Sequence, residues 1–337
     1  MTRRALVTGS AGHIGGLVVR ELLEAGWEVR GLDVAPHAGT RRPWFDHEAF
    51  TALTADVREA PAVRDAADGC EAIVHSAMLL WTGAEDPDEV RSVGHDGLSA
   101  VLSAARTHDC AFVHTSSAAA VGEVPLGSAP ADESRWNARP ITPYTRTKTE
   151  VERRLWAERQ DLRAVAVLPT MTVGPHDPGP TPSNARILGM LRRPASPVWF
   201  DGGLDVVDAR DVARGHVLAL ERGRPGERYL LTGTRLTMRE LLVAVRRSRG
   251  LSGAPRIRLP GRALVAAVTA AEGLAGLAGR RPPVTAAQLR HRLRLAAWQD
   301  GSRARAELGH RPRPLAETLS DLAAEAGWDS RPAGALP

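Results

Sequence analysis

Apolar runs alternate with longer amphipathic segments through the first half of the chain. Residues 4–8 and 28–33 have the length and composition of buried strands, and residues 13–25 between them repeat apolar side chains at helical spacing. The alternation continues with expected strands at 50–53, 72–77, 111–116 and 163–168, and with expected helices at 61–67, 88–107 and 143–160. This pattern predicts an α/β fold of the Rossmann type, a doubly wound parallel sheet with helices on both faces.

The pattern changes after Pro169. Residues 174–200 contain six prolines and predict an irregular but ordered segment. We then expect a strand and a helix within 206–220, with Asp211 as the helix cap, a short strand at 229–231 and mainly helices over 236–327. The chain is therefore predicted to form a larger domain, from residues 1–173 plus about 204–232, and a smaller, mainly helical C-terminal lobe, from 174–203 plus about 233–330.

Residues 263–279 are apolar enough to raise the question of a membrane contact. The stretch is shorter than the roughly 20 apolar residues that a spanning helix needs, and it contains Glu272 and three glycines. We therefore expect no membrane span here, and a helix that is buried or lies beside a pocket.

Glycines gather at the turn between the first strand and the first helix. Gly9, Gly12 and Gly15 stand in the order G-x-x-G-x-x-G, where the commoner motif reads G-x-G-x-x-G. Such glycines let a pyrophosphate approach the backbone, and the helix N-terminus favours its negative charge. The strand–turn–helix context predicts a dinucleotide site that includes His13, in contact with the pyrophosphate, and Ile14. A tight turn without a ligand is the alternative.

Asp33 ends the second expected strand, 18 residues after Gly15. A carboxylate at this place accepts hydrogen bonds from the ribose hydroxyls of adenosine and repels a 2′-phosphate. Asp33 therefore favours NAD as the cofactor. NADP is the alternative, because Arg41 and Arg42 follow closely and are able to bind a phosphate. The alternative is that Asp33 is an ordinary acidic residue at the end of a strand and binds no ligand.

Tyr144 and Lys148 are four residues apart and share one face of a helix. The chain has two tyrosines and a single lysine among its 44 basic residues, so the pairing stands out. The lysine ammonium can lower the pKa of a neighbouring phenol and hold a ribose hydroxyl, and Tyr144 then exchanges a proton with a substrate oxygen. Ser117, at the end of the fifth expected strand, polarises the substrate carbonyl. Ser116 and Thr115 are alternatives for that role. A purely structural role, hydrogen bonding at the end of the strand, is the alternative for all three residues.

Composition and charge narrow the class of function. The chain is 43% apolar and 25% charged, as expected for a globular protein, and its two cysteines are too few for a disulfide framework. A reducing cytosol, and thus a cytoplasmic protein, follows as the expectation. The net charge of +5 comes from arginines interleaved with acids, and aromatics make up only 4%, so no nucleic-acid partner is expected. The eleven histidines show no metal-ligand spacing, and no metal is expected.

Together these motifs resemble the extended short-chain dehydrogenases/reductases, the NAD-dependent epimerase/dehydratase family. The resemblance covers nearly the whole chain, from the glycine-rich turn to the run at 207–213. Between them it includes Asp56-Val57, His75-Ser76-Ala77, Thr115-Ser116-Ser117, Tyr144-x-x-x-Lys148, Pro169 and Gly174-Pro175. Residues 211–233, with Gly215-His216 and the run 226–229, are most similar to the dihydroflavonol-reductase-like group.

The resemblance implies roles for individual residues. Asp56 and Val57 would hold the adenine, Ser76 and Ala77 would lie beside the nicotinamide ribose, and Pro169 would lie near the nicotinamide amide. Ser117, Tyr144 and Lys148 would be catalytic. The family also implies a homodimer, formed through a helix pair that includes the Tyr-Lys helix.

The sequence departs from the family pattern at two places. The expected helix at 88–107 lacks an asparagine that often supports a proton relay, so the relay would run through water or His95. Met171 stands where nucleotide-sugar epimerases typically carry an asparagine that touches the sugar nucleotide. That second departure resembles the reductase pattern.

The substrate side of the cleft is expected to be apolar. Met78 and Trp81 follow the fourth expected strand, and Trp199 and Phe200 face them from the lobe, joined by Met171 and Ser117. Ordinary core packing is the alternative for each apolar side chain. A largely apolar small molecule is therefore the expected substrate.

We therefore predict an NAD(P)-dependent oxidoreductase that interconverts a carbonyl and a secondary alcohol by a Ser-Tyr-Lys mechanism. One rival uses the same site as an NAD-retaining epimerase or dehydratase acting on a sugar or sugar nucleotide. A second rival is a non-catalytic dinucleotide-binding protein, which has no need of Tyr144.

Overall fold

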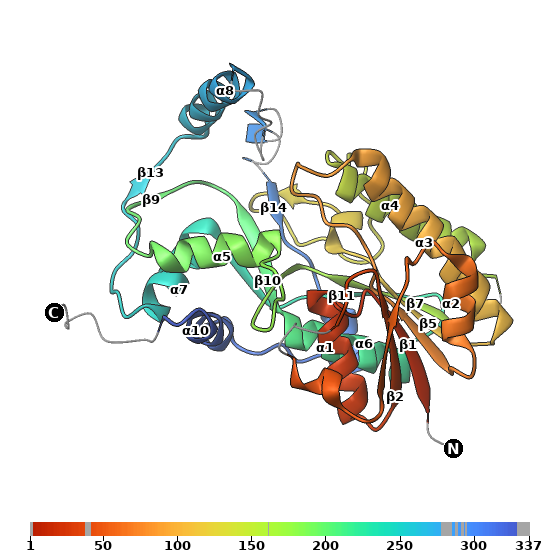
Figure 1. Ribbon diagram of the computed structural model, residues 1–337. Helices are drawn as coiled ribbons and strands as arrows, with labels where there is room; N and C mark the ends of the chain where they lie inside the picture. Colours follow the sequence, from red (N-terminus) through yellow and green to blue (C-terminus); the bar gives the residue numbers. More distant parts are fainter. Residues whose placement is uncertain are drawn as a thin grey trace.

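A seven-stranded parallel sheet forms the centre of the molecule (Figure 1). The computed structural model describes residues 3–37, 42–160, 162–277, 285–286, 289–290, 293 and 295–328. In order across the sheet the strands are β11 (Arg228–Leu231), β7 (Ala164–Pro169), β5 (Ala111–Thr115), β4 (Ala72–His75), β1 (Arg4–Thr8), β2 (Glu28–Asp33) and β3 (Phe50–Thr54). The inner strands are buried on both faces, which explains their nearly continuous apolar sequences.

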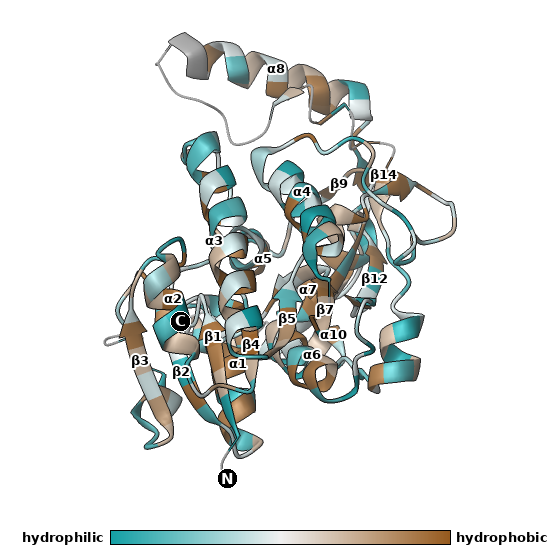
Figure 2. Cartoon of the chain, turned by 90° about the vertical axis from the view of Figure 1, so that its right-hand side faces the viewer, coloured by the Kyte–Doolittle hydropathy of each residue, from teal (hydrophilic) through white to brown (hydrophobic). Residues whose placement is uncertain are grey.

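Helices cover both faces of this sheet. On one face lie α1 (His13–Glu24) and α6 (Ala209–Arg222), and on the other lie α2 (Ala60–Ala67), α3 (Pro87–Thr107) and α4 (Pro143–Glu158). Their apolar stripes and the strands form two separate cores, one on each face of the sheet. Figure 2 shows this concentration of apolar residues in the strands. The expected doubly wound α/β fold is confirmed.

A smaller sheet lies beside the first. It contains β6 (Val124–Pro125), β8 (Met171–Val173), β10 (Gly203–Asp208), β12 (Thr234–Thr237) and β14 (Leu295–Ala297). Against it pack α5 (Pro182–Arg192), α7 (Met238–Ser248) and α10 (Leu315–Glu325), around a core that includes Val206, Leu241 and Leu319. The remaining elements are β9 (Val198–Trp199), β13 (Ile257–Arg258), α8 (Gly261–Leu277), two short 3-10 helices at Pro43–Asp46 and Ala118–Ala120, and one π-helical turn at Ala304–Leu308. The division of the chain into two domains stays a prediction.

Two local predictions are wrong. The segment 174–200 is not irregular throughout, because α5 occupies its centre. Pro182 stands in the first turn of α5, where a missing N–H costs nothing, and Thr181 caps the helix. The cap of α6 is Asp208, whose side chain accepts a hydrogen bond from the Arg210 amide, and not Asp211, which lies in the first turn.

The apolar helix α8 also differs from its expectation. None of its described side chains is buried, and Leu274 is 69% exposed. Figures 1 and 2 both place α8 at the outer end of the molecule, away from the central sheet. The expectation of a buried helix is therefore wrong. Within the described residues, no helix combines the length and the apolar character needed to cross a bilayer.

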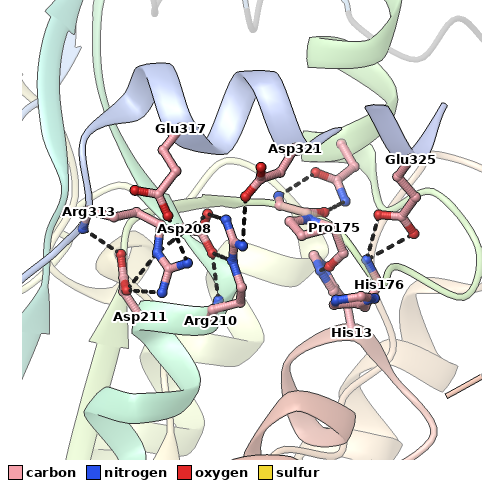
Figure 3. A network of polar contacts seen from close by, with 12 residues as sticks. His13, Pro175, His176, Asp208, Arg210, Asp211, Arg313, Glu317, Asp321 and Glu325 are labelled. Atoms are coloured by element: carbon pink, nitrogen blue, oxygen red, sulfur yellow. Dashed lines mark hydrogen bonds and ion pairs between the residues drawn. The ribbon is translucent and has the colours of Figure 1, made fainter. Parts of the chain in front are cut away.

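A network of polar contacts holds α10 against the rest of the molecule (Figure 3). Arg210 of α6 bridges Asp208 and Asp321, with N···O distances of 2.8 and 2.7 Å. Farther along α10, both carboxylate oxygens of Glu325 accept from the amide of His176, at 3.0 and 2.8 Å. The C-terminal helix is thus tied to the loop after β8, which lies against the glycine-rich turn.

Candidate active site

A large cleft opens at the carboxyl ends of β1 and β4. The strand order reverses between these two strands, and ligands of doubly wound sheets bind at that point. The cleft has a volume of about 1420 Å³, whereas a single small-molecule site takes about 300–1,000 Å³. It therefore has room for two ligands side by side. The glycine-rich turn lines one half, and the second sheet with its helices lines the other.

The backbone of the glycine-rich turn cannot accommodate larger residues. Gly9 has φ +70°, and a Cβ there would lie 2.6 Å from the amide nitrogen of Ala77. A Cβ on Gly15 would lie 2.1 Å from the carbonyl oxygen of Gly9. Because α1 begins directly after this turn and carries no acid in its first turn, its N-terminus presents positive potential to the cleft. The turn fits an anionic ligand such as a pyrophosphate.

Asp33 lies at the end of β2 and faces the cleft. Its Oδ2 accepts a hydrogen bond from the Ala11 amide at 3.0 Å, and its Oδ1 accepts one from the Ala35 amide at 2.9 Å. These bonds fix the carboxylate next to the glycine-rich turn and leave lone pairs on both oxygens for ligand hydroxyls.

Arg42 does not have the role considered for it. Its guanidinium is 4% exposed and donates to the carbonyl oxygens of Ala11 at 3.2 Å, Gly12 at 2.9 Å and His176 at 2.5 Å. Burial lowers the pKa of Arg42 to about 10. Its donors thus brace the glycine-rich turn from behind instead of facing a phosphate. Arg41 lies outside the described residues.

The ring of His13 contacts the loop after β8. Its Nε2 lies 3.0 Å from the carbonyl oxygen of Pro175, and its Nδ1 lies 3.7 Å from the carboxylate of Asp177 (Figure 3). Burial is the main cause that lowers the pKa of His13. Although the residue lines the cleft, its ring nitrogens serve the loop, so the expected contact of the ring with a pyrophosphate is not supported.

The other residues predicted for the cofactor also come together in the cleft. Asp56, Val57, Ser76, Ala77 and Pro169 all line it, together with Gly12 and Ile14. The Asp56 carboxylate is held by Arg58, whose Nε lies 3.0 Å from both carboxylate oxygens, and this hydrogen bonding lowers the pKa of Asp56.

The helix α4 brings Tyr144 and Lys148 to the middle of the cleft. It begins at Pro143, directly after a capping box formed by Thr142 and Thr145. The capping box fixes the start of the helix, and its first two turns form part of the cleft wall. Lys148 is 5% exposed, and its Nζ donates to the carbonyl oxygen of Thr115 at 2.7 Å. Burial lowers the pKa of Lys148 to about 8.

Tyr144 is hydrogen-bonded to Ser117. Burial raises the pKa of Tyr144, and the bond to Ser117 opposes that rise. The expected lowering of this pKa by Lys148 is not seen, because Lys148 directs its ammonium to Thr115. Tyr144 is therefore a protonated phenol at neutral pH, ready to donate a proton. Its catalytic role, and those of Lys148 and Ser117, stay predictions.

The substrate half of the cleft is rich in methionine. Four of the five methionines line the cleft, namely Met78, Met171, Met190 and Met238. Trp81 and Phe200 add aromatic surface. The structure does not place Trp199 in the lining: it belongs to β9, and the guanidinium groups of Arg239 and Arg258 lie over its ring. Its neighbour Phe200, directly after β9, lines the cleft instead.

His95 does not reach the cleft. Its Nε2 lies 3.3 Å from Glu150, so it joins α3 to α4. This position does not support the relay considered for it. Sequence reasoning missed Arg58, Met190 and Met238 as parts of the cleft. Only Arg58 had a local signal, since it follows Asp56 by two residues, while the others are brought in by tertiary packing.

Comparison with known proteins agrees with this geometry. The model of the NAD dependent epimerase/dehydratase family matches residues 5–231. Sterol demethylase protein B of Methylococcus capsulatus is 34% identical over 75% of this chain and 76% of its own. Cinnamoyl-CoA reductase 1 of rice, Oryza sativa subsp. japonica, is 32% identical over 71% of this chain and 74% of its own.

Solved structures share the fold. The crystal structure of gox2253 has a TM-score of 0.81 and 28% identity, and the match covers 97% of this chain and 100% of that one. UDP-glucose 4-epimerase of Thermotoga maritima, at 20% identity and a TM-score of 0.74, covers 96% of this chain and 98% of its own, and it shows the fold alone. The chain belongs to the NAD-dependent epimerase/dehydratase family, the extended branch of the short-chain dehydrogenases/reductases.

Proposed function

We propose that the protein is an NAD(P)-dependent oxidoreductase that interconverts a ketone and a secondary alcohol on a bulky, largely apolar molecule. The observation that carries this proposal is the position of Tyr144. It lies hydrogen-bonded to Ser117 between the glycine-rich half of the cleft and the methionine-rich half.

The residues present fit a nicotinamide dinucleotide. The turn at Gly9 and Gly15 leaves no space for a Cβ, and the N-terminus of α1 favours a pyrophosphate. Asp33 would accept hydrogen bonds from the adenosine ribose, and Asp56 and Val57 would border the adenine. When bound, the nicotinamide supplies or accepts a hydride.

The roles of the chain's own residues follow from where their polar atoms lie. Ser117 donates a hydrogen bond to the substrate oxygen and holds it next to the Tyr144 hydroxyl. Tyr144 donates its proton to that oxygen when a ketone is reduced, and takes the proton back when an alcohol is oxidised. Lys148 keeps a positive charge beside the cofactor ribose and would hold a ribose hydroxyl, which orients the cofactor next to Tyr144. Met78 and Met171 exclude water from the reacting carbon.

The lining of the substrate half supports an apolar substrate. Flexible methionine side chains adapt to ligands of irregular shape and bury them without requiring polar partners. Two relatives carry names that refer to a sterol and to cinnamoyl-CoA, and the sterol ring system and the cinnamoyl group are both largely apolar. Met171 provides no amide for a sugar nucleotide. These points favour the reductase over an epimerase that acts on a sugar nucleotide.

Cofactor preference tests the cofactor half of the proposal. We expect the protein to bind NAD(H) more tightly than NADP(H), because Asp33 repels a 2′-phosphate and Arg42 is occupied by carbonyl oxygens. Replacing Asp33 by asparagine removes the charge and keeps the shape. The variant should bind NADH about tenfold more weakly and lose most of the discrimination against NADPH. Isothermal titration calorimetry with both cofactors measures this.

The matched control is Asp46→Asn. Asp46 lies in the turn after Arg42 and does not line the cleft, so this variant removes a nearby charge without touching the site. Tighter binding of NADPH than of NADH by the unmodified protein would contradict the assignment of Asp33. If the unmodified protein binds neither NAD(H) nor NADP(H), the proposed oxidoreductase function is wrong.

A further inference from the structure

Behind the cleft, α4 carries a buried carboxylate. Glu152 lies two turns after Tyr144 and one turn after Lys148, and it is 0% exposed. It accepts hydrogen bonds from the Ser116 hydroxyl and, at 3.3 Å, from the indole Nε1 of Trp156. It also forms an ion pair with Arg228, whose Nε lies 2.5 Å from its Oε1.

Arg228 connects this carboxylate to a loop of the cleft. It is 7% exposed and lies at the start of β11, within the run 226–229 that resembles the dihydroflavonol-reductase-like group. Its Nη1 donates to the carbonyl oxygens of Glu133 at 2.5 Å and Arg135 at 3.0 Å. Its guanidinium lies 3.9 Å from the ring centre of Trp136. The same loop places Arg135 and Asn137 in the cleft wall.

Stability alone does not account for such a pair. Removing two charges from water costs more than their attraction returns unless the geometry is very good, and an apolar pair of similar size is often as stable. Here the carboxylate also bonds to Ser116, the residue between Thr115 and Ser117. The ion pair is therefore bonded to the end of β5 through Ser116, and to the loop 133–137 through Arg228.

We propose that Glu152 and Arg228 form a buried ion pair that positions the end of β5, where Ser116 bonds to Glu152 and the carbonyl of Thr115 holds Lys148, and ties it to the loop 133–137. Glu152 is thus a positioning residue and not a catalytic one. The importance of this pair for turnover rests on the proposed function, because Lys148 and Ser117 act in that reaction.

The surroundings of Lys148 show why the charge of Glu152 matters. Lys148 interacts electrostatically with His75 from β4, His114 from β5 and His216 from α6, and with Glu152 from its own helix. Tyr144 lies one turn before Lys148 on that helix. Burial lowers the pKa of His75 to about 3 and that of His216 to about 4, and it holds the pKa of His114 well below its usual value. These histidines are neutral at pH 7.

Glu152 is therefore the charged partner that favours the ammonium form. Burial lowers the pKa of Lys148, and the carboxylate of Glu152 acts in the opposite direction. Without Glu152, Lys148 would lose the attraction of the carboxylate, and Arg228 would be left as an unpaired positive charge behind it. Both changes would favour the neutral amine of Lys148.

Because Lys148 is the only lysine, its titration can be read directly. Protein labelled with ¹³C at lysine Cε gives a single lysine signal, and its shift against pH reports the charge of Lys148. For the unmodified protein we expect a midpoint near pH 8. Glu152→Gln, which keeps the shape, should lower that midpoint by about one pH unit.

The matched control is Glu150→Gln. Glu150 lies on the same helix, but it is bonded to His95 and its side chain is 42% exposed, so its loss should leave the midpoint unchanged. If Glu152→Gln does not fold, Glu152→Asp retains the charge on a shorter stem and should lower the midpoint by a smaller amount. A folded Glu152 variant with the midpoint of the unmodified protein would overturn the proposal.

The titration needs neither a substrate nor a cofactor. A lowered midpoint in Glu152→Gln without any oxidoreductase activity in the unmodified protein would reject the proposed function and keep the positioning role. Oxidoreductase activity in the unmodified protein, together with an unchanged midpoint in Glu152→Gln, would keep the proposed function and reject the positioning role.

Discussion

Replacing Tyr144 by phenylalanine is expected to lower kcat for ketone reduction by about 10²–10⁴-fold, the usual contribution of a positioned general acid. The phenol is the proton donor proposed for the substrate oxygen, and burial raises its pKa so that it is protonated at neutral pH. The ring itself stays, so the cleft keeps its shape. Affinity for NADH should change little, since Lys148 and the glycine-rich turn remain. Steady-state kinetics and calorimetry on the same preparation measure both quantities.

The chain offers a matched control for this substitution. Its only other tyrosine, Tyr229, lies in β11 and donates to Glu307 at 2.8 Å, away from the cleft. Tyr229→Phe also removes one hydroxyl and should retain the activity. A Tyr144→Phe protein that turns over at the rate of the unmodified protein would exclude Tyr144 as the acid.

Replacing Lys148 by methionine should impair both binding and turnover. Methionine fills the buried channel but removes the charge and the donor that Nζ presents at the end of β5. Loss of one charge-assisted hydrogen bond predicts NADH binding about 10–100-fold weaker. The value of kcat should fall as well, because the cofactor loses the donor that orients it next to Tyr144.

Arginine should not restore the function of Lys148. Its planar guanidinium is larger than an ammonium, and the position is 5% exposed and closed by Thr115. Calorimetry and steady-state kinetics of Lys148→Met and Lys148→Arg give the comparison. Full activity of Lys148→Arg would show that only a positive charge is needed and would contradict this account of the site.

The sequence was sufficient for the central sheet because local and tertiary signals agree there. The strands β1 and β5 are short runs rich in apolar residues, and their neighbouring helices carry clear apolar stripes. The turn at Gly9 was also recognisable, since no other residue tolerates its backbone and its contact with Ala77. All the residues predicted for the cofactor line one cleft.

The sequence was less informative where long-range contacts decide. The prolines before and after α5 suggested irregular chain, yet Pro182 only marks the first turn of the helix. Asp211 looked like a cap, but Asp208 precedes it and binds the free amide of Arg210. Nothing local shows that Arg42 would turn under the glycine-rich turn to reach His176, 134 residues later.

The substrate half shows the same limitation. Met190 lies on α5 and Met238 at the start of α7, so their meeting with Met78 and Met171 depends on the packing of the smaller sheet. The sequence offered both Trp199 and Phe200 for this wall, and of the two the structure places only Phe200 in the lining, while Trp199 contacts Arg239 and Arg258.

The central claim is that the protein carries out a net redox reaction and releases its cofactor. The most direct test supplies NADH deuterated at C4 of the nicotinamide, with a panel of ring ketones and of UDP- and dTDP-sugars, and follows cofactor absorbance and product mass together. The account predicts many turnovers with a bulky apolar ketone, one cofactor oxidised per alcohol formed, and deuterium on the carbinol carbon. Conversion of a nucleotide sugar with a tightly retained, unconsumed cofactor would contradict it and identify an epimerase or dehydratase instead.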